Sequence, residues 1–330
     1  MRIAVFSTKT YDQEYFEKYN KEYNYSFSFY ETALNPDTAK LTADCNAVCV
    51  FVNDIVDDNT IKILSKNGIQ LIALRCAGYN NVDLDAAAKE NIKVVRVPAY
   101  SPEAVAEHAL ALILTLNRKT HKAYNRVREG NFSLKNLIGF NLNNKTIGVI
   151  GTGKIGETFC KIIKGFGCKI IAYDIAENEN LVALGVEYMP LEKVFEQSDI
   201  LSLHCPLNKH TKHIVNKASI ASMKDGVMII NTSRGALIKT EDAIEGLKNK
   251  KIGYLGIDVY EQEENLFFED HSEVIIEDDM LLRLLSFPNV LITSHQAYFT
   301  KEAMDQITTI TLENIKAFEN GSELVNEVGQ

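Results

Sequence analysis

The stretch Val149-Ile150-Gly151-Thr152-Gly153-Lys154-Ile155-Gly156 decides the fold of this chain. It completes an apolar run that reads as a short buried strand, and residues 157–164 after it have the apolar spacing of a helix. A strand, a G-x-G-x-x-G turn and a helix form the context that a dinucleotide-binding site requires. Gly151 permits the tight turn, Gly153 lets a pyrophosphate approach the backbone, and Gly156 lets helix and strand pack closely.

The next apolar run strengthens this interpretation. Lys169–Asp174 reads as a second strand that ends in an acid about 20 residues after the glycines, where a ribose-binding acid is expected. Asp174 would repel a 2′-phosphate, and Ile175-Ala176 after it supply no cation to receive one. A glycine turn without a ligand is the simpler alternative, but strand, glycines, helix and terminal acid together argue against it. The pattern favours NAD over NADP.

Length, composition and charge limit the other possibilities. The chain has 330 residues, which predicts two domains, and its 46% hydrophobic and 24% charged residues are typical of a soluble globular protein. A net charge of −9 argues against binding to nucleic acid or to an anionic membrane, although a local Arg can still hold an anionic substrate. The longest apolar stretch, residues 109–116, is far below the roughly 20 residues of a membrane span, and no signal peptide is recognisable.

The six cysteines lie mostly within apolar segments and include no C-x-x-C pair. The histidines near Cys205 lack the spacing of a metal site, so no metal is expected. We expect buried free thiols and a reducing, cytoplasmic location.

The first part of the chain alternates strands with helices, which predicts a parallel sheet covered on both faces. The expected strands are Ile3–Ser7, Ala47–Asn53, Leu71–Arg75 and Val94–Val97, and the expected helices are Asp12–Tyr19, Asn59–Lys66 and Asp83–Glu90. This part has no G-x-G-x-x-G of its own. Residues 1–100 are therefore expected to form a flavodoxin-like, doubly wound substrate domain.

A second domain is expected over residues 101–298. Ser101 is a good N-cap and Pro102 suits the first helical position. The helix Glu103–Asn117 that follows is apolar on nearly every face, so we expect it to be buried at a domain or subunit contact. Six strands then match a complete Rossmann NAD-binding domain, namely Thr146–Ile150, Lys169–Asp174, Asp199–His204, Val227–Thr232, Tyr254–Val259 and Val290–Thr293.

The last segment, residues 301–320, has helical apolar spacing and follows the complete nucleotide sheet. It could return to the first domain, so residues 299–330 are assigned to that domain. Two connections between domains would form a hinge, with the active site in the cleft between them.

Three polar stretches follow apolar strands of the second domain and supply candidates for chemistry. Arg234 follows one strand, Glu263 lies in an acidic loop after the next, and His295 follows the last. Their alternatives are a surface Arg, a solvated acidic turn and a capping His, and a solvated turn is the preferred interpretation for Glu261 and Glu264. The carboxyl ends of parallel strands lie at the same edge of a sheet, so we expect Arg234, Glu263 and His295 to lie close together.

That grouping suits the reduction of a 2-keto acid. The planar guanidinium of Arg234 can bind a carboxylate through two hydrogen bonds and polarise the adjacent carbonyl. His295 can give and take a proton near neutral pH, and a carboxylate on its other ring nitrogen would favour the imidazolium. Glu263 is our choice for that carboxylate.

With these residues placed, the sequence resembles the D-2-hydroxyacid dehydrogenase family over essentially its whole length, and within it the fermentative, lactate-type branch. The matching segments, in the order of the family, are residues 98–109, 149–156, 204–207, 231–235, 256–261 and 294–297. Several independent motifs make this match specific. It implies a homodimer or higher homo-oligomer that binds NAD and a small 2-keto or 2-hydroxy acid.

The resemblance also implies roles for individual positions. Arg234 would bind the substrate, His295 would be the acid/base and Glu263 would orient it. The cofactor would be bound by Gly151, Gly153, Lys154, Ile155, Gly156, Asp174, Cys205, Pro206, Thr232, Ser233 and Asp258, and the substrate by Ala77, Gly78, Tyr100, Tyr298 and Phe299, together with Arg234.

The lactate-type branch is favoured by two features. Tyr298 and Phe299 would close the pocket around a small side chain, which favours pyruvate, although discrimination per methylene is only about 1–3 kcal/mol. The loop of residues 265–283 also looks like the insert of the lactate-type members.

Two alternatives stay open. Another D-2-hydroxyacid dehydrogenase could act on 2-ketoisocaproate, glycerate or 3-phosphoglycerate, although a phosphorylated substrate should need more cations than Arg234. A non-catalytic NAD-sensing regulator could share this fold, but it need not keep Arg234, Glu263 and His295.

Overall fold

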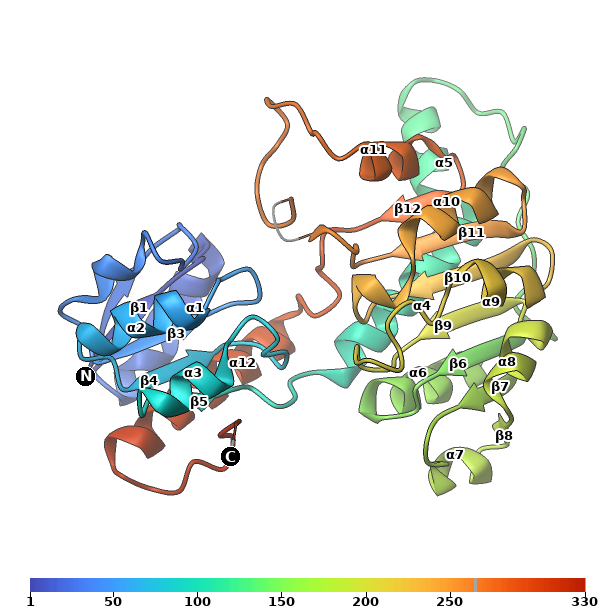
Figure 1. Cartoon of the computed structure of the whole chain (residues 1–330). Helices are drawn as coiled ribbons and strands as arrows, with labels where there is room; N and C mark the ends of the chain where they lie inside the picture. Colours follow the sequence, from blue (N-terminus) through green and yellow to red (C-terminus); the bar gives the residue numbers. More distant parts are fainter. Residues whose placement is uncertain (264–265, 330) are drawn as a thin grey trace. The chain divides into compact units, whose positions relative to one another are not determined.

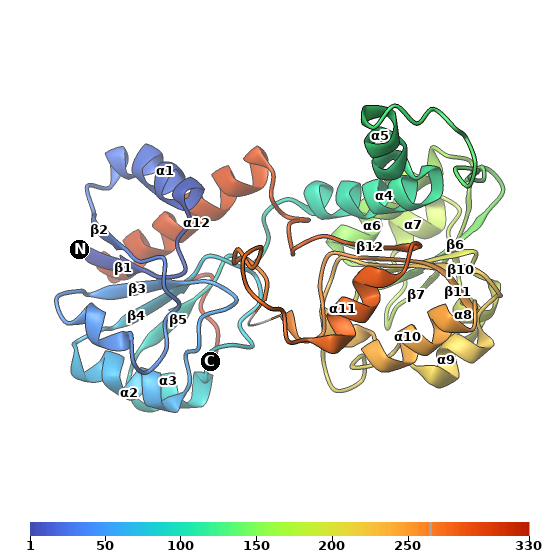
Figure 2. The same ribbon diagram turned by 90° about the horizontal axis from the view of Figure 1, so that it is seen from above.

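The computed structural model describes residues 1–263 and 266–329. The chain divides into two compact units, one made of Met1–Ser101 and Phe299–Gln330, the other of Pro102–Tyr298. Each unit is a parallel sheet between two layers of helices (Figures 1 and 2).

The first unit has a five-stranded sheet in the order β2-β1-β3-β4-β5. Its strands are β1 (Arg2–Val5), β2 (Ser26–Phe29), β3 (Ala47–Val50), β4 (Leu71–Leu74) and β5 (Lys93–Val95). All the pairings are parallel. This is the strand order of flavodoxin-like folds, so the predicted fold of this part is confirmed.

Strand β2 is a difference from the sequence-based expectation, which places only four strands here. Its residues Ser26-Phe27-Ser28-Phe29 alternate polar and aromatic side chains, the period of a strand with one buried face. The four expected strands are instead continuous apolar runs, as buried central strands are. A search for apolar runs alone therefore misses an edge strand.

Helices cover both faces of this sheet. One face carries α1 (Thr10–Tyr19) and α12 (Lys301–Glu319), and the other carries α2 (Asp58–Lys66) and α3 (Leu84–Lys89) (Figure 2). Short 3-10 turns occur at Asn20–Glu22 and Ala39–Thr42. Leu312 and Ile315 of α12 are fully buried against Ile3 and Leu71 of the sheet. The C-terminal helix is thus part of the core of the first unit.

The second unit has a seven-stranded parallel sheet in the order β12-β11-β10-β9-β6-β7-β8. Its strands are β6 (Thr146–Ile150), β7 (Lys169–Tyr173), β8 (Glu187–Tyr188), β9 (Ile200–Leu203), β10 (Val227–Asn231), β11 (Ile252–Ile257) and β12 (Val290–Ile292). Counted from β6, this is the Rossmann order 3-2-1-4-5-6 with one further strand, so the predicted Rossmann fold is confirmed. The further strand is β12. The strand that the sequence does not predict is β8, which has two residues, pairs only with β7 and is too short to leave a pattern.

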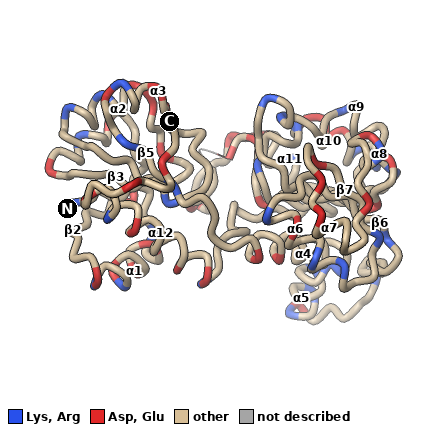
Figure 3. Tube along the Cα trace, turned by 90° about the horizontal axis from the view of Figure 1, so that it is seen from below, with Lys and Arg blue, Asp and Glu red and all other residues tan. Residues whose placement is uncertain are grey.

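Eight helices are described in the second unit. One face of the sheet carries α4 (Pro102–Arg118), α6 (Lys154–Lys164) and α7 (Glu179–Ala183); the other carries α8 (Leu191–Gln197), α9 (Lys217–Ser222), α10 (Thr240–Lys248) and α11 (Asp279–Ser286) (Figure 2). The remaining helix, α5 (Thr120–Arg128), follows α4 directly and includes the basic residues Lys122, Arg126 and Arg128 (Figure 3). A 3-10 turn lies at Gly235–Leu237.

The apolar composition of helix α4 is explained by its burial inside the second unit. Ala106, Ala109, Leu112 and Ile113 are buried in one cluster with strands β6 and β10. The helix therefore belongs to the core of the second unit, and its apolar faces do not by themselves indicate a subunit contact. Its start at Pro102 is the one predicted.

The lactate-type insert is only partly a loop. Helix α11 occupies Asp279–Ser286, so the stretch expected as a loop up to residue 283 becomes helical at 279. Asp278 caps this helix by accepting a hydrogen bond from the Leu281 N–H at 2.9 Å, and Leu281 and Leu284 are buried. The sequence contains a signal for this helix, because Asp278 is a good N-cap and Leu281 and Leu284 have helical spacing.

Candidate active site

The glycine turn between β6 and α6 is built so that two of its glycines face the protein and one faces open space. A Cβ on Gly151 would lie 2.4 Å from the backbone nitrogen of Cys205, and the residue has a φ of +91°. A Cβ on Gly156 would lie 2.0 Å from the carbonyl oxygen of Gly151. Around Gly153 there is nothing within 4 Å, and this residue is the N-cap of α6 without a side-chain cap. The backbone N–H groups at the start of α6 are thus open to an anion.

Asp174 lies directly after β7 and is tied to the glycine turn. Its carboxylate accepts hydrogen bonds from the Thr152 N–H and hydroxyl, at 2.5 and 3.1 Å, and from the Ile175 N–H at 2.6 Å. Tyr188 of β8 donates to the Thr152 hydroxyl at 2.9 Å, so this edge strand supports the same turn. The acid is held at the end of the second strand, as a ribose-binding residue must be.

The turn after β10 holds Arg234 through its own side-chain contacts. The buried Asn231 amide donates to the Arg234 carbonyl oxygen at 2.9 Å and accepts from the Ser233 N–H at 3.0 Å. The Ser233 hydroxyl donates to the Cys205 carbonyl oxygen at 2.7 Å, which joins this turn to the one after β9. The Thr232 hydroxyl is buried without a hydrogen-bond partner, as expected for a group that meets a ligand.

Glu263 and His295 are in direct contact. Oε1 of Glu263 lies 2.7 Å from Nδ1 of His295, and its Oε2 accepts a hydrogen bond from the Tyr260 N–H at 2.7 Å. Both side chains are largely buried, with exposed fractions of 19% and 16%. Because the carboxylate takes Nδ1, the other ring nitrogen, Nε2, is left for a substrate. The ring of Phe268 lies against the imidazole at a centroid distance of 5.7 Å.

Asp258, at the end of β11, holds the turn that presents His295. Its side chain is fully buried and accepts hydrogen bonds from the Gln296 and Ala297 N–H groups, at 2.9 and 2.7 Å. The Thr293 hydroxyl and His108 contact the same carboxylate. Burial opposes ionisation, but the hydrogen bonds from His108 and Thr293 outweigh it and lower the pKa of Asp258.

His295 itself has a left-handed backbone, with a φ of +54°, and its N–H donates to the Asp258 carbonyl oxygen at 2.6 Å. His108 of α4, 3.0 Å from the Thr293 hydroxyl, has no role in the sequence-based assignment. The sequence signal for a role of His108 is its place on an otherwise apolar helix, because a buried histidine needs a polar partner.

Glu261 corrects a sequence-based expectation. The preferred interpretation was a solvated acid, but Glu261 contacts His213 Nε2 at 2.6 Å and accepts the Thr240 N–H at 2.9 Å. The other residue of that expectation, Glu264, lies outside the described residues, as does Asn265, the first residue of the expected loop. Tyr260, which precedes Glu261, is buried and donates to Asp278 at 2.8 Å; burial and this hydrogen bond raise the pKa of its phenol.

The substrate-side candidates lie on both units. In the first, the Ala77 carbonyl oxygen accepts from Arg96 at 2.8 Å, and the Arg96 guanidinium lies 5.1 Å from the centroid of the Tyr79 ring. The Gly78 carbonyl oxygen accepts from the Cys76 thiol. Tyr100 is half-buried, and Phe299 is exposed and packs edge-on against Tyr11. Tyr298 is a buried residue of the second unit.

The six cysteines are free and buried, as predicted. Burial raises the pKa of the Cys205 thiol to about 11, which removes it as a nucleophile at neutral pH. Among the described residues, no group of His, Cys, Asp and Glu could hold a metal ion, and no helix is long and apolar enough to cross a membrane.

The residues present fit a dinucleotide. The space at Gly153, the uncapped start of α6, the unpartnered Thr232 hydroxyl and Asp174 after β7 provide what a pyrophosphate, a nicotinamide end and a ribose each require. Two further residues assigned to the cofactor are exposed: Lys154, which follows Gly153, and Pro206, which follows Cys205.

Comparisons with known proteins identify the family of this chain. A family model described as "D-isomer specific 2-hydroxyacid dehydrogenase, NAD binding domain" matches residues 110–297. The D-lactate dehydrogenase of Escherichia coli is 51% identical over 328 residues, which cover 99% of this chain and 100% of that protein.

Solved structures give the same result. The apo-structure of Escherichia coli D-lactate dehydrogenase has a TM-score of 0.92 at 49% identity and covers 99% of this chain and 100% of its own. A D-lactate dehydrogenase from Aquifex aeolicus, solved with NAD and lactic acid, has a TM-score of 0.87 at 34% identity and covers 99% of each chain. The predicted family and cofactor are thereby confirmed, and the chain belongs to the D-isomer specific 2-hydroxyacid dehydrogenases, a family of NAD-dependent oxidoreductases.

Proposed function

We propose that this chain is a D-lactate dehydrogenase that reduces pyruvate to D-lactate with NADH, in a reversible reaction. The observation that carries the proposal is the contact between Glu263 and His295, 2.7 Å long, at the edge of the sheet that also bears the glycine turn and Arg234. The 51% identity to a D-lactate dehydrogenase over the whole chain supports lactate over the other substrates of the family.

Arg234 binds the substrate carboxylate in this proposal. Its turn is fixed by Asn231, and a guanidinium can form two parallel hydrogen bonds to a carboxylate while it polarises the neighbouring carbonyl. The backbone N–H groups of Ala77 and Gly78 add further donors to the same carboxylate. The contact of Arg96 with the Ala77 carbonyl supports this, because it orients the peptide.

His295 supplies the proton. NADH, when bound, supplies the hydride to C2 of pyruvate. The protonated imidazole gives its Nε2 proton to the carbonyl oxygen, which becomes the hydroxyl of lactate. Glu263 accepts the Nδ1–H and stabilises the imidazolium, and Asp258 holds the turn on which the imidazole stands. In the oxidation of lactate the neutral imidazole takes the proton back.

The cofactor site of this proposal uses the glycine turn and its neighbours. Gly151, Gly153, Lys154, Ile155 and Gly156 form the pyrophosphate turn, and Asp174 binds the adenosine ribose. Four further cofactor-side residues are Cys205, Pro206, Thr232 and Ser233. Asp258 is assigned near the nicotinamide end only through the turn it holds, because its side chain has no exposed surface.

Substrate size is set by aromatic side chains. We assign Tyr100, Tyr298 and Phe299 to the pocket around the methyl group of pyruvate. Tyr298 is buried, and the ring of Phe299 packs edge-on against Tyr11. Residues 1–100 with 299–330 are accordingly the substrate domain, and residues 101–298 the NAD-binding domain.

We further propose a homodimer, or a multiple of it, in the cytoplasm. The side chains of Phe132, Leu134 and Ile138, after α5, are 75%, 82% and 84% exposed, and a cluster of such residues is typical of a contact surface. The six free cysteines suit a reducing compartment.

The test is a panel of 2-keto acids with NADH, read as loss of NADH absorbance. The proposal predicts the highest kcat/KM with pyruvate. A higher kcat/KM with 2-ketoisocaproate, hydroxypyruvate or a phosphorylated keto acid would support another dehydrogenase of the family. No turnover with any of them would support an NAD-sensing regulator and contradict the proposal.

A further inference from the structure

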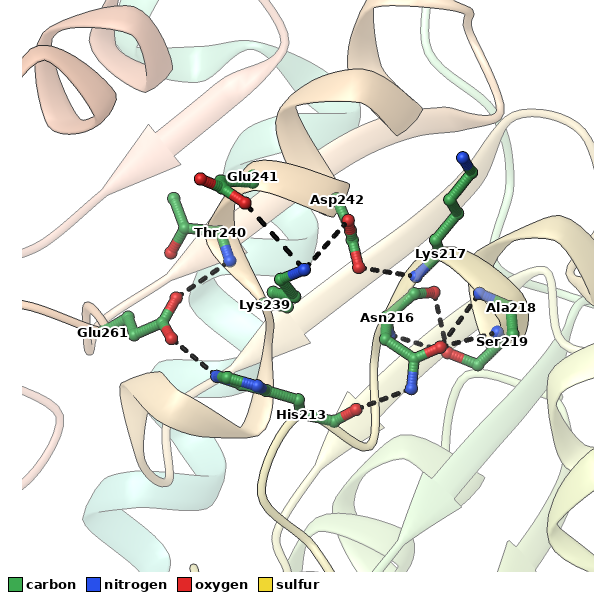
Figure 4. A network of polar contacts seen from close by, with 10 residues as sticks. All are labelled: His213, Asn216, Lys217, Ala218, Ser219, Lys239, Thr240, Glu241, Asp242 and Glu261. Atoms are coloured by element: carbon green, nitrogen blue, oxygen red, sulfur yellow. Dashed lines mark hydrogen bonds and ion pairs between the residues drawn. The ribbon is translucent and has the colours of Figure 1, made fainter.

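His213 and Glu261 join three turns of the second unit that follow neighbouring strands. The ring of His213, from the segment after β9, points at Glu261, from the turn after β11, and Nε2 lies 2.6 Å from Oε1 (Figure 4). The other carboxylate oxygen accepts the Thr240 N–H at 2.9 Å, at the start of α10. Burial opposes ionisation of Glu261, but the hydrogen bonds from Thr240 and His213 outweigh it and lower the pKa of the carboxyl group.

The His213 side of this contact is anchored to the segment that follows Arg234. The His213 N–H donates to the Ala236 carbonyl oxygen at 2.8 Å, and the Val215 N–H donates to Leu237 at 3.0 Å. His213 has a left-handed backbone, with a φ of +54°, and its carbonyl oxygen accepts from Asn216 at 2.8 Å. Backbone hydrogen bonds therefore join residues 213–215 to the segment that follows Arg234.

The backbone at Tyr260 and Glu261 contacts both the Arg234 turn and the side chain of Glu263. A Cβ on Gly235, the residue after Arg234, would lie 2.1 Å from the Tyr260 carbonyl oxygen and 2.5 Å from the Glu261 nitrogen. The Tyr260 N–H in turn donates to Glu263. The Arg234 turn and the Glu263 turn are thus packed backbone to backbone, with no side chain between them to absorb a shift.

We propose that His213 and Glu261 are positioning residues, a pair that clamps the Arg234 turn against the Glu263 turn. The inference rests on the proposed function, in which the Arg234 turn carries the group that binds the substrate carboxylate and the Glu263 turn carries the carboxylate that orients His295. Neither His213 nor Glu261 is assigned to the substrate or the cofactor. Loss of the pair frees the two turns to shift, so the substrate carboxylate and the proton donor lose their fixed spacing, and such shifts are costly to rate.

His213→Asn breaks the contact with little change to the backbone. Asn tolerates the left-handed conformation but is too short to reach Glu261, whereas His213→Gln is long enough to restore a hydrogen bond. We expect His213→Asn and Glu261→Ala to lower kcat/KM for pyruvate by about tenfold or more, while the Kd for NADH stays within about twofold. His213→Gln should recover part of the loss.

Asp242→Asn is the matched control. Asp242 belongs to the same polar network, where it accepts a hydrogen bond from the Lys217 N–H at 2.9 Å and pairs with Lys239 (Figure 4). Within the part of the chain that the structure describes, it forms no hydrogen bond or ion pair with the turns of Arg234 and Glu263. It should lower the melting temperature as much as the other variants do while leaving kcat/KM unchanged.

A double-mutant cycle separates positioning from stability. If the pair acts through Glu263, then His213→Asn costs less in the Glu263→Gln background than in the wild type. Full additivity, or a loss of kcat/KM in Asp242→Asn equal to that in His213→Asn, would overturn the inference. If Arg234→Lys is impaired but His213→Asn and Glu261→Ala are not, this inference fails and the proposed function stands. If the wild type reduces no 2-keto acid, both fail.

Discussion

At Arg234, one substitution can separate the effect of the positive charge from the effect of the planar pair of hydrogen-bond donors. Arg234→Lys keeps a cation in the turn but loses the planar pair of donors that matches a carboxylate. We expect kcat/KM for pyruvate to fall about tenfold or more, which corresponds to about 1.4 kcal/mol of transition-state stabilisation. Steady-state kinetics on the purified variant measure this, and full activity would mean that Arg234 is not the carboxylate anchor.

We expect Glu263 to influence the pH dependence of pyruvate reduction through its contact with His295. A carboxylate against Nδ1 stabilises the protonated imidazole of His295, which is the form that donates a proton. In Glu263→Gln this contact is lost, and we expect the pH optimum of pyruvate reduction to move to lower pH. A pH profile of kcat/KM identical to that of the wild type would rule out this role.

At the scale of residues, the sequence predicted groups that end strands and missed groups whose partners are remote. Arg234, Glu263 and His295 lie in turns or loops that follow apolar strands, so the parallel sheet alone predicts their common edge. Glu261 looks like any acid in a charged loop, because its partner His213 lies 48 positions away. No local pattern contains such a contact.

The element that organises the cofactor site is the glycine turn, and its glycines should respond differently to a methyl group. Gly156→Ala places a Cβ against the Gly151 carbonyl oxygen, so we expect a loss of stability of about 1–3 kcal/mol. Gly153→Ala meets open space, so the protein should keep its stability but bind NADH more weakly. Denaturant unfolding and NADH fluorescence titration measure the two effects. Equal stability of both variants would contradict this packing.

The turn after β12 should be sensitive to acid through Asp258. Its pKa is lowered in the folded protein from an ordinary value of 3.8, so its contribution to stability is complete well above that pH and disappears as the pH falls through the lowered value. Asp258→Asn should cost about 1.5–3 kcal/mol at pH 7, because hydrogen bonds to a charged group are lost, and less at pH 3. Unfolding curves at both pH values test this; a cost that does not shrink at pH 3 would contradict it.

At the scale of elements, long apolar patterns were predictable and short or mixed ones were not. The strands of the glycine motif and helices such as α12 follow from periodicity and caps. Strand β8 has only two residues, too few to leave a pattern. Helix α11 has apolar residues at helical spacing, but it lies within the stretch of residues 265–283 that was expected to be a loop. Both are stabilised by neighbours that the sequence places elsewhere.

For the whole molecule, the surface after α5 should control association. Phe132→Asp with Leu134→Asp places charges where a partner would be packed, so we expect the oligomer to dissociate toward a monomer. Val325→Asp is the control, because this residue is equally exposed, at 84%, but belongs to the first unit. Sedimentation velocity measures the mass. An unchanged oligomer in the double variant would place the contact elsewhere.

The architecture of both units follows from the sequence because alternating strands and helices permit few topologies, and the glycine motif marks where the second begins. The substrate does not follow from that pattern, since one fold serves many 2-hydroxy acids.

The most direct test of the account is the product formed from pyruvate and NADH. The purified protein should oxidise NADH when pyruvate is added, and the lactate formed should be the D enantiomer, with little turnover when NADPH replaces NADH. Formation of L-lactate, equal efficiency with NADPH, or no oxidation of NADH would contradict the account.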